Sequence, residues 1–131
     1  MGTRHLTYVY EDSDTILLCM YGQWDGYPSG HGADLAQFLN SFDAMVNGIP
    51  VGDKRKMANG MGCLAAQLVA HFKKEVGQYY IYPPKLGHDC WQEYEYHIRP
   101  NSVKVTDGSG YPLFNGTWED FLDFCTENAD V

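Results

Sequence analysis

Two runs of β-branched and aromatic residues near the start of the chain predict a pair of strands. They cover residues 4–10 and 15–21, and Glu11-Asp12-Ser13-Asp14 between them has the composition of a tight turn. Residues 78–82 predict another strand, which Pro83-Pro84 ends. Apolar and polar residues alternate over 93–99, as is typical of a half-buried strand, and residues 103–106 predict its neighbour.

Between these strands the apolar residues repeat at helical spacing. One stripe is made of Leu35, Phe38, Leu39, Phe42, Met45 and Val46, and Gly48-Ile49-Pro50 ends it. A second stripe is made of Met61, Leu64, Ala65, Leu68, His71 and Phe72. His71 lies on that stripe, so it is interpreted as a buried core histidine. Thr117, with Asp120 three residues later, predicts the cap of a last helix.

The predicted order is therefore ββ-α-α-βββ-α. It indicates an α+β fold with a mostly antiparallel sheet of about five strands and three helices packed on it. No segment has the length or composition of an interdomain linker, so residues 1–131 are expected to form one domain.

Composition narrows the classes of partner. With 131 residues and 44% hydrophobic residues the chain can bury a core without disulfides, and Cys19, Cys63, Cys90 and Cys125 contain no CxxC pair. The net charge of −8 argues against a nucleic-acid duplex as partner. The longest apolar run, residues 16–21, is too short to span a bilayer, so no membrane partner and a cytoplasmic location are expected.

The segment richest in side chains that could bind a ligand or catalyse a reaction is the glycine-rich loop over residues 23–32. It leads into a predicted helix, whose first turn has unpaired amides and partial positive charge. Gly30 and Gly32 would let a ligand approach the backbone, while Ser29 adds a hydroxyl and His31 a possible cation. Donors, acceptors and aromatic faces precede them at Gln23, Trp24, Asp25 and Tyr27. The plain alternative is a capped helix after a tight turn.

A second glycine-led helix start lies at Asn59-Gly60-Met61-Gly62. The basic run Lys54-Arg55-Lys56 precedes it, so a second phosphate could bind there; the alternative is a solvated charge run. Arg4, at the start of the first strand, is suited to bidentate phosphate contact. A salt bridge at the sheet end is the competing role for Arg4.

Catalysis would use the same loop. Asp25 or His31 could act as general base, Ser29 or water as nucleophile, and Arg4 could stabilise phosphoryl charge. His88-Asp89-Cys90 with His97 beyond could be written as metal ligands, but no HxxxH, HExxH or CxxC spacing supports them. No metal and no cofactor are therefore expected.

Four stretches carry a resemblance to a known family. The opening Met1-Gly2-Thr3-Arg4, the loop YGQWDGYPSGHGADL, the helix start NGMGCLAAQLVAHFK and the strand EYEYHI resemble a widespread family of small phage and prophage proteins. The resemblance runs over most of the chain. It implies a location in the cytoplasm of an infected or lysogenic bacterial host.

By analogy, some small phage proteins inhibit bacterial defence by sequestering nucleotide signals such as cyclic ADP-ribose isomers or cyclic dinucleotides. The resemblance therefore implies a homo-oligomeric binder of a phosphate-containing nucleotide. The family motif implicates Arg4, Gln23, Asp25, Tyr27, Ser29 and His31. A metal-independent phosphodiesterase and a module that binds a host protein are the alternative functions.

Overall fold

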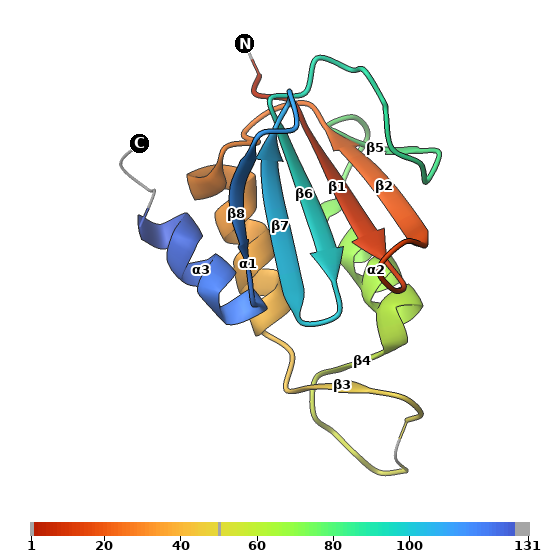
Figure 1. Ribbon diagram of the computed structural model, residues 1–131. Helices are drawn as coiled ribbons and strands as arrows, with labels where there is room; N and C mark the ends of the chain where they lie inside the picture. The colour runs from red at the N-terminus through yellow and green to blue at the C-terminus, as the bar shows by residue number, and fades with distance from the viewer. Residues whose placement is uncertain (1, 50, 128–131) are drawn as a thin grey trace.

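The computed structural model describes residues 2–49 and 51–127 (Figure 1). Met1 of the opening motif and Pro50 of the predicted helix stop lie outside the described residues. The main strands are β1 (His5–Tyr10), β2 (Ile16–Gly22), β5 (Tyr79–Tyr82), β6 (Tyr94–Arg99), β7 (Ser102–Asp107) and β8 (Pro112–Gly116). The helices are α1 (Ala33–Asn40), α2 (Gly60–Phe72) and α3 (Trp118–Glu127), and a π-helical turn, Pro28–Gly32, leads into α1.

The six main strands form one mixed sheet in the order β5-β2-β1-β6-β7-β8. All neighbours are antiparallel except the central pair β1 and β6, which run parallel with His5 opposite Tyr94. The predicted α+β fold, with a mostly antiparallel sheet and three helices, is confirmed. β8 was missed because its sequence, PLFNG, combines a proline, an asparagine and a glycine.

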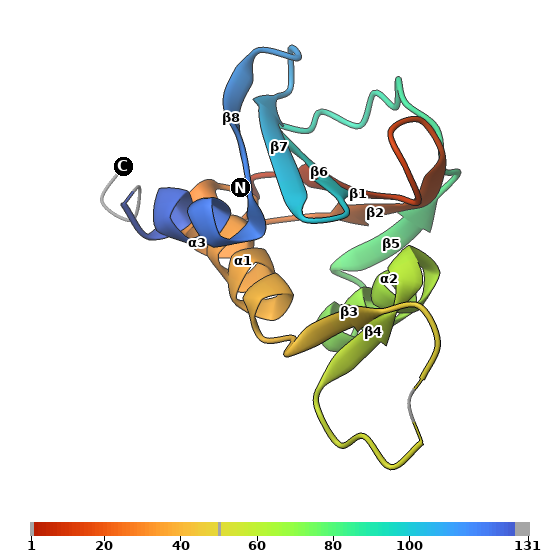
Figure 2. The same cartoon turned by 60° about the horizontal axis from the view of Figure 1, so that its bottom comes forward.

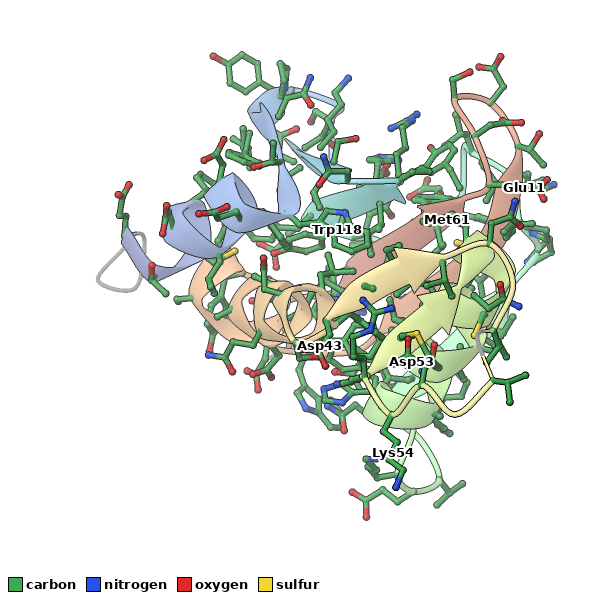
Figure 3. The ribbon with its side chains drawn as sticks, turned by 90° about the horizontal axis from the view of Figure 1, so that it is seen from below. Glu11, Asp43, Asp53, Lys54, Met61 and Trp118 are labelled. Atoms are coloured by element: carbon green, nitrogen blue, oxygen red, sulfur yellow. The ribbon has the colours of Figure 1, made fainter. Side chains whose placement is uncertain are left out.

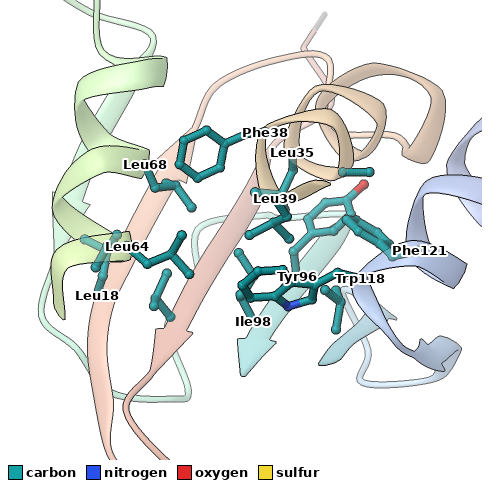
Figure 4. Packing of buried hydrophobic residues seen from close by; sticks show 14 of the residues in the cluster. Leu18, Leu35, Phe38, Leu39, Leu64, Leu68, Tyr96, Ile98, Trp118 and Phe121 are labelled. Carbon is teal, nitrogen blue, oxygen red and sulfur yellow. The ribbon is translucent and has the colours of Figure 1, made fainter. Parts of the chain in front are cut away.

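The three helices cover one face of the main sheet (Figures 1 and 2). The core between them takes Leu35 and Leu39 from α1, Leu64 and Leu68 from α2, and Phe121 from α3 (Figure 4). Inward-facing strand residues such as Val9, Met20, Tyr96 and Ile98 complete it. The 3.6-residue spacing thus predicted the buried positions Leu35, Phe38 and Leu39 of α1 and Met61, Leu64, Ala65, Leu68 and Phe72 of α2.

The opposite sheet face carries a smaller aromatic cluster. Leu6, Tyr8, Tyr10, Cys19 and Tyr21 are buried there, with Tyr82 and Cys90 packed against them. His97 stacks on Tyr8 with ring centroids 4.9 Å apart, and its Nδ1 lies 2.8 Å from the Tyr10 hydroxyl. The hydrogen bond satisfies the polar atoms of Tyr10 and His97, whereas the buried Tyr8 hydroxyl has no hydrogen-bond partner among the described residues.

The first predicted helix is too long, because α1 ends at Asn40 and does not reach Val46. The Asn40 side chain donates to the carbonyls of Ala36 and Trp118, and the Ser41 hydroxyl donates to Phe38. These side chains compete with the continuing helix for its backbone groups. Residues Ala44–Val46 instead form β3, which pairs in parallel with β4, Met57–Asn59, in a separate two-stranded sheet.

His71 is a second correction. It lies near the end of α2 with its side chain exposed, and its ring rests 4.9 Å from that of Phe38. Phe72, the next residue, is buried in the core, so His71 lies on the side of the helix that faces away from it.

Among the described residues, no helix is long and apolar enough to cross a membrane.

Candidate functional site

The start of α1 does not present free amides. In the turn before it, the N–H of Gly30 donates to Tyr27, that of His31 to Asp25, and that of Gly32 also to Tyr27. The Ala33 N–H donates to Gly30. The protein's own carbonyls thus take up the amides of three of the four predicted cradle residues, all but Ser29, so these donors are not free for an anion.

His31 points into the protein. Its Nε2 lies 2.7 Å from the Thr7 hydroxyl, and its ring packs 4.0 Å from that of His5. Both imidazoles are buried, and His31 Nδ1 and both His5 nitrogens have no hydrogen-bond partner among the described residues. The predicted general base is therefore a core residue that contacts β1.

Burial sets the charge of this histidine pair. Desolvation lowers the pKa of His5 to about 4, and a backbone contact with Trp24 opposes this only in part. Desolvation and the neighbouring His5 lower the pKa of His31 well below its usual value. Both rings are therefore neutral at pH 7. A neutral, enclosed imidazole cannot serve as the cation that the sequence suggested for an anion site.

Glycines in this loop serve close packing. A Cβ on Gly22 would lie 2.1 Å from the His5 ring, and one on Gly30 would lie 2.6 Å from the Asp25 carbonyl oxygen. The Gly26 carbonyl accepts the Tyr96 hydroxyl at 2.6 Å. The glycines of this motif therefore serve mainly to let the loop pack closely onto the end of the sheet.

The exposed members of the predicted site make different contacts. Asp25, whose φ is +60°, accepts the Tyr27 hydroxyl, and its charge acts on Tyr79, a residue of the helix-side core. Arg4 instead acts electrostatically on Cys90, which packs on the opposite face. The Gln23 side chain accepts the Gln78 N–H, and Trp24 is partly exposed. The Gly26 N–H of this loop donates to the carbonyl of Thr3, the residue before Arg4, and a joint role of Arg4 with Asp25 or His31 stays a prediction.

The start of α2 is built differently. Asn59 does not cap the helix with its side chain, which instead accepts the Gly48 N–H at 2.7 Å. A Cβ on Gly60 or Gly62 would meet nothing within 4 Å, and Gly60 has a φ of +79°. The first turn of a 13-residue helix therefore opens outward without a side-chain cap.

A groove begins at this helix start. Its first part, about 470 Å³, is lined by Glu11, Met45, Val46, Asn47, Gly60, Met61, Pro100 and Asn101. A second part, about 270 Å³, shares Met45 and Asn101 and includes Asn40, Asp43, Trp118 and Glu119. Figure 3 shows Glu11 and Met61 toward one end and Trp118 and Asp43 toward the other. We refer to both parts together as the lower groove.

Of the residues predicted at the second helix start, Gly60 lines this groove, while Asn59 and Gly62 are only its near neighbours in the chain, and the other walls were not predicted. Glu11, Met45, Asn101 and Trp118 come from four distant segments, which only the fold brings together. The basic run does not line the groove. Arg55 forms a salt bridge with Asp53 at 2.7 Å, and Lys56 donates to the Ser41 hydroxyl.

Among residues 2–49 and 51–127, no group of three or more histidine, cysteine or acidic side chains is arranged to hold a metal ion. His97 lies beside Glu95, with 3.3 Å between its Nε2 and the carboxylate, while His88 contacts the Pro83 carbonyl.

No protein-family model matched the chain, and comparisons with curated proteins and with solved structures found no similar protein.

Proposed function

We propose that the protein binds a small phosphate-containing nucleotide in the lower groove, with the phosphate at the start of α2. The observation that carries the proposal is the uncapped, glycine-flanked first turn of α2 opening into a groove of ligand size. Ligand sites usually have volumes of roughly 300 to 1,000 Å³, and the first part of the groove falls in that range.

The lining suits the other parts of a nucleotide. Met45, Met61 and Pro100 offer apolar surface for a base, and the amides of Asn47 and Asn101 offer donors and acceptors for its edge. The Glu11 carboxylate repels phosphate but accepts hydrogen bonds from ribose hydroxyls. This polarity favours a ligand whose negative charge sits at the α2 side and whose sugar lies toward Glu11.

The test is calorimetric titration with cyclic dinucleotides and cyclic ADP-ribose isomers, alongside thermal unfolding. Binding to the folded state should raise the unfolding temperature as ligand is added. Gly62→Glu should reduce affinity at least about tenfold, because it places a negative charge in the first turn of α2. The same charge favours the helix dipole, so lost binding would not reflect lost folding.

Ala66→Glu is the matched control, since it adds the same charge at an exposed position one turn further along α2. Asp25→Asn, in the first loop, should also bind like the wild type. No heat with every nucleotide, or equal affinity for Gly62→Glu, would contradict the proposal. Chromatography after denaturation should recover intact ligand; new products would instead support the phosphodiesterase alternative.

A further inference from the structure

The loop that joins β3 to β4 extends away from the main sheet and the helices (Figures 1 and 2). We call residues 44–49 and 51–59 the arm. At the tip of the arm, the side chains of Ile49 and Val51 do not fold back onto the body, since they are 70% and fully exposed, whereas Ala58 at its base is buried in the core. Apolar side chains gathered on an extended loop are typical of a contact surface.

The arm and the body carry opposite charges. The arm contains three of the nine basic residues and one of the seventeen acidic ones, so its formal charge is +2 and that of the rest is −10. Since Arg55 pairs with Asp53, the positive charge comes from Lys54 and Lys56. The labelled Lys54 projects from the arm in Figure 3.

The complementary surface lies on α3. Glu119, Asp120, Asp123 and Glu127 are exposed along this helix, and no basic residue follows Lys104 in the chain. The opposite sheet edge is less suited to pairing, because Lys73 donates to the Gly77 and Tyr79 carbonyls beside β5.

We propose that the arm binds a second copy of this chain, which it meets at the acidic outer face of α3. In a twofold arrangement each copy supplies one arm and one α3, so the two contacts are equivalent. Because the arm is positively charged and the rest of the chain is negatively charged, a second copy of this chain suits the arm better than a partner that offers only apolar surface.

Sedimentation velocity over a concentration series tests the proposal. The wild type should form dimers that added salt weakens. The double variant Ile49→Asp, Val51→Asp should raise the dimer dissociation constant at least about tenfold. Val76→Asp is the matched control, because Val76 is equally exposed and apolar but lies in the turn after α2.

A charge exchange gives the sharper result. Lys54→Glu alone, and Asp123→Lys with Glu127→Lys, should each weaken self-association, whereas a mixture of the two variants should restore it. A monomer at all concentrations, or a mixture no tighter than its parts, would overturn the proposal. The proposal would also be overturned if the protein floated with phosphatidylglycerol vesicles and the arm variant did not, because the arm would then bind a lipid surface.

Discussion

The two glycine-led helix starts look alike in sequence but are opposite in structure. Before α1, the amides of Gly30, His31 and Gly32 donate to carbonyls of the same loop, and His31 is buried against His5. At α2, Gly60 and Gly62 have open space around them and Asn59 leaves the helix uncapped. The difference shows that glycine marks either tight packing or open access, depending on what surrounds it.

The largest expected difference between the two helix starts is their response to acid. His5 has a folded pKa of about 4 against an ordinary value of 6.5. Below pH 6.5 the unfolded chain therefore binds a proton that the folded protein does not. Stability is full above that pH and falls as pH drops toward 4, by about 3 kcal/mol for His5 alone.

Acid unfolding followed by tryptophan fluorescence checks this. His5→Leu should move the midpoint to lower pH, because it removes the buried group whose protonation favours the unfolded chain in acid. His71→Gln, at an exposed histidine, should move it much less. Hydrogen exchange should reveal amides 30–33 losing protection before those within α2. An unchanged midpoint in His5→Leu would rule out this source of acid sensitivity.

A smaller effect is expected from filling the first helix start. Gly30→Ala places a methyl group 2.6 Å from the Asp25 carbonyl oxygen, a backbone atom that cannot move aside freely. We expect a loss of about 1–3 kcal/mol in the free energy of unfolding, measured by urea denaturation. An unchanged free energy of unfolding would mean that the loop is looser than its hydrogen bonds indicate.

The smallest effect is expected at the second helix start, and its sign is opposite. Gly62→Ala meets nothing within 4 Å and replaces a poor helix former in the first turn. It should raise the free energy of unfolding by about 0.5–1 kcal/mol. Denaturation of Gly30→Ala and Gly62→Ala under the same conditions compares the two starts directly. A loss of stability in Gly62→Ala would contradict the open geometry.

The sequence by itself determined the elements whose cause is local. Apolar spacing in 61–72 and the alternation in 94–98 predicted α2 and β6, and Thr117 was correctly predicted as a cap, since its hydroxyl accepts the Asp120 N–H. The helix predicted from the sequence was wrong beyond Asn40, because the Asn40 side chain donates to the carbonyl of Trp118, which is 78 residues away. Periodicity cannot detect such a contact.

Only the tertiary structure decided which helix start is open. The composition of the first loop predicted a polar cradle, yet its imidazole is enclosed by His5 from β1, Phe72 from α2 and Tyr96 from β6. The groove at α2 depends on Glu11, Asn101 and Trp118, which are distant in the chain. The type of a residue determines which interactions its side chain can make. Whether a ligand can reach that side chain depends on which distant segments of the chain pack over it, and only the tertiary structure determines this.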